Sequence, residues 1–159
     1  MQTDSIEKTA SVQRVVLKDL NLDRIYSLEK AVKDFVLHYK EEASTFLGTW
    51  KWIMAILGGG TDQLWCVFEG DEVTAYFIVT PQQELSGAWY LFIHQAWGRS
   101  DVPRETKQGY LKTICDEAFK WGCKSIKFLT RRNMEAFTEW LPKAWMPTRT
   151  LFELRCDNG

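Results

Sequence analysis

Side chains that could bind an anion gather in one loop of the sequence. Arg99, Arg104 and Lys107 supply positive charge there, and a guanidinium group binds phosphate or carboxylate through paired hydrogen bonds. The same loop carries Asp101, which adds negative charge, and Pro103, which removes one backbone N–H donor. We therefore expect any anion bound here to be held through side chains.

The cysteines and histidines do not form a metal-binding pattern. The sequence has 4 cysteines and 2 histidines, the cysteines are widely spaced, and no CxxC pair occurs. We expect no metal site. Scattered cysteines without a signal-peptide pattern predict buried thiols in a reducing compartment, and hence a protein that is cytoplasmic at synthesis.

Composition narrows the classes of partner. The 159 residues contain 20 Lys and Arg against 21 Asp and Glu, a formal net charge of -1, so no overall attraction to nucleic acid is expected. The longest apolar run, residues 52–57, is far shorter than the roughly 20 residues that span a membrane. We therefore expect contact with neither nucleic acid nor membrane.

Hydrophobic spacing indicates two helices in the first part of the chain. Residues 1–11 are polar and predict a flexible lead-in, and residues 12–17 predict a strand. From Asn21 the apolar residues recur every three or four positions, with Asn21 or Asp23 able to cap a helix. A second helix is predicted from about Ser44 to Leu57, where three glycines end it.

After these glycines the pattern changes to that of strands. We predict that Pro81 ends a strand. A helix with Pro103 in its first turn should be capped by Ser100 or Asp101 and run to Trp121. A short helix should begin at Asn133. The predicted strands are residues 64–68, 73–79, 88–94, 125–130 and 150–155, of which 64–68 and 73–79 form a hairpin and 88–94 is central.

This order predicts one domain over residues 12–159. Its fold class is α/β, or mixed α+β, with a central mixed sheet of about six strands flanked by helices. The strand at 88–94, the helix after it and the strand at 125–130 form a β-α-β unit, whose two strands run parallel.

Two stretches in this order resemble the GNAT superfamily of N-acetyltransferases. They are Leu91–Trp97, similar to the end of that family's central strand, and Asn133-x-x-Ala136-x-x-x-Trp140-x-x-x-Ala144-Trp145. The resemblance implies acetyl transfer from acetyl-CoA to an amine, with the pyrophosphate held by backbone N–H groups of a glycine-rich loop at a helix N-terminus. If acetyl-CoA binds, the matching positions predict contacts from Ile93, Arg99, Ser100, Arg104, Lys107 and Asn133.

The sequence departs from the family pattern where the chemistry takes place. The loop lacks the glycines that let a phosphate approach the backbone, and Trp140 stands where the family commonly has a tyrosine that protonates the leaving thiolate. His94, Tyr110 and Glu84 could substitute, although His94 also fits a strand-end histidine with a backbone bond, and Tyr110 an ordinary helix aromatic. The sequence assigns no catalytic residue.

Eight tryptophans are too many for one small core, so some should lie at the surface, where tryptophan dominates protein contacts. Short, tryptophan-rich GNAT-like chains without the CoA loop resemble proteins of tailed bacteriophages. We therefore predict a non-catalytic interaction or structural protein without cofactor, whose partners are other protein subunits, with a phage virion as the implied setting. The alternatives are an atypical acetyl-CoA-dependent N-acetyltransferase and a module that binds CoA as a ligand.

Overall fold

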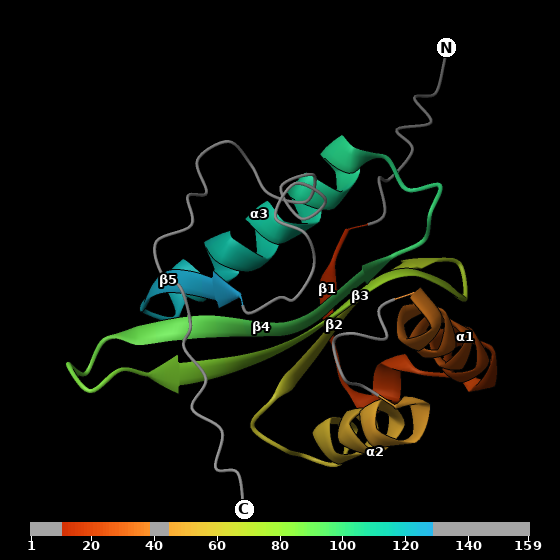
Figure 1. Cartoon of the computed structure of the whole chain (residues 1–159), viewed down its shortest axis with the longest axis horizontal. Coiled ribbons are helices and arrows are strands. Elements are labelled where there is room, and N and C mark those ends of the chain that lie inside the picture. The colour runs from red at the N-terminus through yellow and green to blue at the C-terminus, as the bar shows by residue number, and fades with distance from the viewer. Residues whose placement is uncertain (1–10, 39–44, 129–159) are drawn as a thin grey trace, which may run out of the picture.

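The computed structural model describes residues 11–38 and 45–128. Within them one sheet is flanked by helices on both faces (Figure 1). In chain order the elements are β1 (Gln13–Val15), a 3-10 turn (Leu17–Asp19), α1 (Leu22–His38), α2 (Phe46–Leu57), β2 (Gln63–Glu69), β3 (Glu72–Gln83), β4 (Trp89–Gly98), α3 (Arg104–Lys120) and β5 (Cys123–Phe128).

Among the described residues the sheet has five strands in the order β1-β2-β3-β4-β5. The first three pairings are antiparallel, and β4 pairs with β5 in parallel, as expected for a β-α-β unit whose crossover is α3. The mixed α+β class is therefore confirmed. The predicted sixth strand at 150–155, the short helix from Asn133 and all but the last residue of the lead-in at 1–11 lie outside the described residues.

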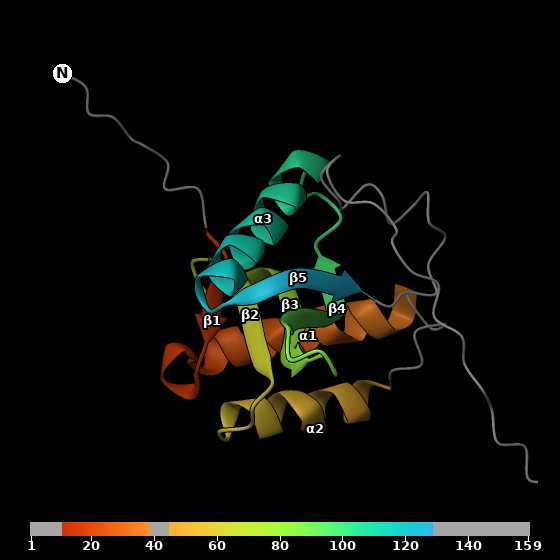
Figure 2. The same cartoon turned by 90° about the vertical axis from the view of Figure 1, so that its left-hand side faces the viewer.

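The two faces of the sheet are covered by different helices. Helix α3 lies on one face, and α1 and α2 lie on the other (Figure 2). The α3-side core contains Leu111 and Ile114, and the opposite core contains Leu28 and Phe35 from the predicted stripe of α1; all four are fully buried. The spacing of apolar residues thus correctly predicts which side of α1 and of α3 is buried, whereas Leu47 and Met54 of α2 are exposed.

Helix starts follow local capping chemistry in two of three cases. The Asn21 Oδ1 accepts a hydrogen bond from the N–H of Arg24, as predicted, and Thr45 caps α2 by accepting one from the N–H of Gly48. Helix α3 differs, because Pro103 is its N-cap instead of lying in its first turn. Asp101 caps no helix, since its carboxylate binds Arg99.

The prediction that Pro81 ends a strand is wrong. Strand β3 continues through Pro81 to Gln83, paired with β4. Its pairing with β2 stops earlier, at Val79, so residues 80–83 form an edge on that side within the described part of the chain. Proline is tolerated on a free strand edge, because the missing N–H leaves no neighbouring strand without a donor.

Strand β4 is also longer than predicted. The predicted strand ends at residue 94, whereas residues 95–98 continue it to Gly98. A bulge separates its two halves, since Ile78 of β3 lies opposite Gln95 whereas Val79 lies opposite Ile93, which leaves His94 as the extra residue. With this extension β4 pairs with residues 75–83 of β3.

Three cysteines are buried and two tryptophans lie partly at the surface, as the sequence predicts. Cys66, Cys115 and Cys123 are buried free thiols, and burial raises the pKa of the Cys115 thiol to about 12. Trp89 and Trp121 are each nearly half exposed, which confirms that some tryptophans lie at the surface.

Among the described residues no helix is long and apolar enough to cross a membrane, and no cluster of metal-ligating side chains occurs.

Candidate functional site

The bulge in β4 sets the direction of two consecutive side chains. At a bulge, neighbouring residues point to the same face of the sheet instead of alternating. His94 and Gln95 both contact α2: the His94 ring lies 4.9 Å from that of Trp52, edge to face, and the Gln95 amide donates to the Thr49 hydroxyl over 3.2 Å. A titratable ring therefore lies directly under α2.

The described pairing between β4 and β5 ends where the bulge begins. The last pair is Ile93 with Phe128, and residues 129–159 lie outside the described part of the chain.

A chain of hydrogen bonds connects His94 to a carboxylate. The Thr80 hydroxyl donates to Oδ1 of Asp62 over 2.7 Å, and its oxygen lies 2.7 Å from Nε2 of His94. The other Asp62 oxygen accepts from the indole N–H of Trp52 over 2.6 Å. We call Asp62, Thr80 and His94 the His94 relay; its members come from the segment before β2, from β3 and from β4.

The number of hydrogens in the relay fixes the tautomer of His94. An ionised carboxylate only accepts, so the single hydroxyl hydrogen of Thr80 is directed at Asp62. The Thr80 oxygen must then accept from His94, which places the ring hydrogen on Nε2. Nδ1 is left with a lone pair and has no hydrogen-bond partner among residues 11–38 and 45–128. Neutral His94 is therefore a base with a defined accepting atom.

The surroundings keep that ring neutral near pH 7. His94 is half-buried between the rings of Trp52 and Phe92, the latter 4.7 Å away. Burial lowers the pKa of His94 below its usual 6.5, and the negative charge of Asp62 partly opposes that shift. When Nδ1 gains a proton, the new positive charge is stabilised by Asp62 through Thr80.

Tyr110 and Glu84, the other two predicted proton-transfer candidates, lie elsewhere. Tyr110 is buried in the α3-side core, where desolvation raises the pKa of its phenol, so the ordinary structural interpretation holds. Glu84 forms an ion pair with Lys127, whose ammonium lies 4.2 Å above the ring of Tyr90. The backbone-bonded interpretation of His94 is wrong, because its ring bonds the Thr80 hydroxyl.

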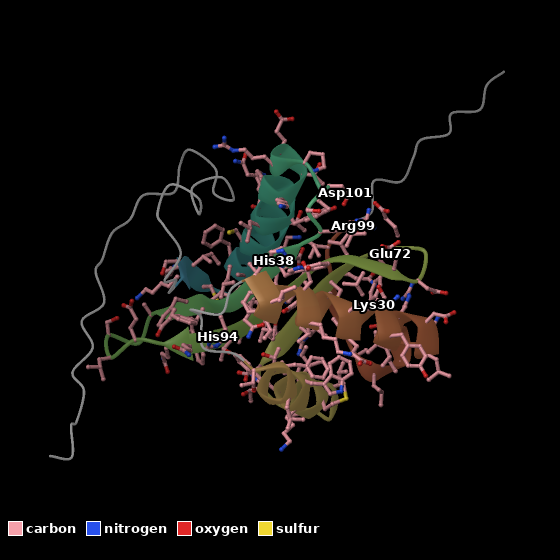
Figure 3. All side chains as sticks on the ribbon, turned by 45° about the vertical axis from the view of Figure 1, so that its right-hand side comes forward. Lys30, His38, Glu72, His94, Arg99 and Asp101 are labelled. Atoms are coloured by element: carbon pink, nitrogen blue, oxygen red, sulfur yellow. The ribbon has the colours of Figure 1, made fainter. Side chains whose placement is uncertain are left out.

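The loop after β4 is held by its own ion pairs. Arg99 binds Asp101 through Nε at 2.5 Å, Glu72 at 2.6 Å and Glu69 at 3.4 Å, the last two from the turn between β2 and β3. We call these four residues the Arg99 cluster. Figure 3 shows Arg99, Glu72 and Asp101 together at the end of the sheet away from His94.

Three of the other residues predicted to contact CoA lie around the start of α3, and the remaining two lie elsewhere in the chain. Ser100 is exposed in the turn, Arg104 is exposed at the start of α3, and Lys107 is half-buried one turn further on. The side chain of Ile93 is buried in the α3-side core, which leaves only its backbone for a ligand. Asn133 lies outside the described residues. CoA contacts from these positions stay a prediction.

Sequence reasoning missed Asp62, Thr80 and Trp52. Asp62 lies just after the glycines that end a helix, and Thr80 precedes a proline. In the sequence both residues are therefore typical of turns, and neither indicates a functional site. Thr80 and His94 meet because they lie on neighbouring strands with their side chains on the same side of the sheet. That meeting depends on the register of β3 against β4, which no residue pattern in either strand gives.

Comparison with solved structures identifies the fold. A ribosomal-protein-alanine N-acetyltransferase from Brucella melitensis biovar Abortus superposes with a TM-score of 0.69 at 9% identity, covering 93% of this chain and 99% of that one. A GNAT family acetyltransferase from Staphylococcus aureus gives 0.60 at 12% identity, covering 91% and 97%. An aminoglycoside acetyltransferase from an uncultured soil metagenomic sample gives 0.68 at 10% identity, covering 94% and 99%.

The chain has the GNAT fold. This confirms the structural part of the resemblance seen in the sequence. No protein-family model matches the sequence, and no curated protein matches it. At these identities the likeness establishes fold and leaves activity to the site itself.

Proposed function

We propose that this protein transfers an acyl group from a thioester to a primary amine. The observation that carries the proposal is the His94 relay at the bulge of β4, in a chain whose fold is that of solved acetyltransferases. Among the described residues, Nδ1 of His94 has no hydrogen-bond partner, so it can accept a proton. An amine acyltransferase needs such a base to take a proton from the attacking amine.

The relay supplies the proton transfer that this reaction requires. As the amine nitrogen attacks the thioester carbonyl, a C–N bond forms and the nitrogen becomes positively charged. Nδ1 of His94 takes its proton, while Thr80 and Asp62 hold the ring and stabilise the imidazolium. The C–S bond then breaks, the amide is released, and the imidazolium returns the proton to the departing thiolate.

This cycle also explains how the chain could work with tryptophan at position 140. The family resemblance assigns protonation of the thiolate to a tyrosine at that position, and an indole N–H is no acid at neutral pH. In the proposed cycle His94 both receives and returns the proton, so no second acid is needed. The lowered pKa of His94 favours the return step, because a weakly basic ring gives up its proton readily.

A second candidate is an interaction subunit without chemistry, for which a phage virion is the setting implied by the sequence resemblance. It is favoured by surface aromatics near the start of β5: Trp89, Phe119 and Trp121 are 46%, 51% and 45% exposed. Exposed aromatic rings are typical of protein contacts. This candidate leaves the His94 relay without a use, and we therefore rank it second.

The proposal is tested by measuring transfer directly. Acetyl-CoA and acetyl-pantetheine are offered with a panel of a polyamine, an arylamine and a peptide α-amine, while thiol release and the mass of the N-acetyl product are followed. We expect turnover that falls about 100-fold in His94→Gln, the usual contribution of a general base. His38→Gln is the matched control, because His38 is exposed at the end of α1.

Two results would contradict the proposal. One is a folded wild-type protein that forms no product with any pair of donor and amine. The other is His94→Gln that transfers as fast as wild type, since the base would then lie elsewhere.

A further inference from the structure

The ring of His94 lies between two other aromatic rings on the α2 side of the sheet. The ring of Trp52 in α2 lies 4.9 Å from it at an interplanar angle of 72°, and that of Phe92 in β4 lies 4.7 Å from it at 57°. Neither ring is stacked face to face on the imidazole, and both residues are only half-buried. Aromatic surface beside the proposed base is therefore left for a ligand to contact.

Tyr90 lies on the same face of β4 but is already engaged. It is two residues before Phe92 on the strand, which places both side chains on one face. The Tyr90 hydroxyl donates to the side chain of Gln82 over 2.7 Å, and the Lys127 ammonium covers its ring at 4.2 Å. The aromatic surface available to a ligand is thus that of Trp52 and Phe92.

The carboxylates on this face also have partners. One oxygen of Asp62 accepts from Thr80 and the other from Trp52, and Glu84 pairs with Lys127. An alkyl amine is a cation at neutral pH, and a cation that leaves water needs an opposite charge to compensate. On this face it would have to compete for that charge with groups of the chain itself. A ligand that carries no charge meets no such competition.

The chemistry of His94 favours an uncharged amine as well. Its pKa is below 6.5, whereas an alkylammonium group titrates near 10.4 as in lysine, so Nδ1 would take that proton against a factor of about 10⁴. An arylamine nitrogen is uncharged at neutral pH, because its lone pair is delocalised into the ring. It attacks the thioester carbonyl without losing a proton first. Nδ1 takes one proton once the C–N bond has formed, and the thiolate receives it when the C–S bond breaks.

We infer that the acyl acceptor is an uncharged arylamine whose ring packs against Trp52 and Phe92, with its nitrogen at Nδ1 of His94. The inference rests on the proposed function for the transfer itself. It adds the class of acceptor, which is flat, aromatic and neutral, and it disfavours polyamines and peptide amines.

Binding of three small amines tests this without relying on turnover. Aniline is flat and neutral, cyclohexylamine is cationic and not flat, and benzylamine joins a flat ring to a cationic amine. The full chain, labelled with 15N-histidine, is titrated with each at pH 7 while the ring signals of His94 are followed. We expect aniline to bind about tenfold more tightly than either cationic amine.

Variants of Phe92 test the ring contact. Phe92→Leu should weaken aniline binding about fivefold and leave cyclohexylamine unchanged, because leucine keeps apolar volume without a flat ring. Phe92→Tyr keeps the ring and should bind aniline like wild type. Phe119→Leu is the matched control, since it removes a ring that is 51% exposed on α3, at the other face of the sheet. Circular dichroism of each variant checks that the fold is retained.

The outcomes separate this inference from the proposed function. Aniline that does not bind, or that binds no more tightly than the cationic amines, overturns the inference. So does equal loss of aniline binding in Phe92→Leu and Phe92→Tyr, or acyl transfer to a polyamine or peptide amine but to no arylamine. Aniline binding that depends on the Phe92 ring, without transfer from any thioester, supports the arylamine site and contradicts the proposed function.

Discussion

The Thr80 hydroxyl lies 2.7 Å from Nε2 of His94 and 2.7 Å from Oδ1 of Asp62, so one side chain connects a base to a carboxylate. A hydroxyl has one hydrogen, and giving it to Asp62 makes Thr80 an acceptor toward His94. The direction of both bonds follows from this count. Thr80 is therefore a positioning residue that sets which nitrogen of His94 is free.

Removing the Thr80 hydroxyl should impair transfer without weakening amine binding. Thr80→Val keeps the shape of the side chain but removes the bond that orients the imidazole. Loss of about 1.4 kcal/mol, near the value of one hydrogen bond, corresponds to about a tenfold fall in kcat with KM little changed. Steady-state kinetics measure both. Thr80→Ser keeps the hydroxyl and should restore most of kcat, whereas equal loss in the two variants would point to packing instead.

Stability should depend on pH through His94. The folded chain holds the pKa of His94 below 6.5 through burial, while the unfolded chain titrates near 6.5. Between these two values the unfolded state binds more protons, so the free energy of unfolding increases as pH rises toward 6.5. Above 6.5 the ring is neutral in both states and its contribution is constant.

Urea denaturation from pH 5 to 8 isolates this contribution when wild type is compared with His94→Gln, since all other groups titrate in both. The difference in unfolding free energy between the two proteins should change only below pH 6.5, with wild type losing more as pH falls. Parallel curves over the whole range would show that His94 is not desolvated in the fold.

Two glycines should respond in opposite ways to the same substitution. Gly70, in the turn between β2 and β3, has φ +62°, and an added Cβ would meet no atom within 4 Å. Gly70→Ala should therefore destabilise through backbone strain alone, by about 1 to 2 kcal/mol. Gly109 lies in α3 with equally free space, so Gly109→Ala should stabilise by about 1 kcal/mol. Thermal and urea unfolding measure both, and shifts of the same sign would contradict the turn geometry.

Local patterns in the sequence predict elements well where local physics decides them. The stripe of α1 with its Asn21 cap, the hairpin around Gly70 and the buried side of α3 all follow from spacing and capping within a few residues. The sequence alone also shows that the loop lacks the glycines of a phosphate-binding loop and carries Asp101 and Pro103 instead.

What sequence could not predict depends on pairing between strands. Pro81 is tolerated inside β3 because the pairing of β3 with β2 ends at Val79, and this register cannot be read from one strand alone. The His94 relay has the same origin, since Thr80 and His94 are 14 positions apart and meet only where β3 pairs with β4. Arg99 was expected to bind an outside anion, and its three internal partners come largely from a turn distant in sequence.

The most direct test of the account is the protonation state of His94 in solution. Long-range 1H–15N spectra of the 15N-histidine protein show the signals of its 2 histidines, and the His38→Gln variant identifies the signals that belong to His94. We expect neutral His94 at pH 7, with its hydrogen on Nε2, a bare Nδ1, and titration below pH 6.5. A hydrogen found on Nδ1, or a ring still charged at pH 7, would contradict the relay and the chemistry proposed from it.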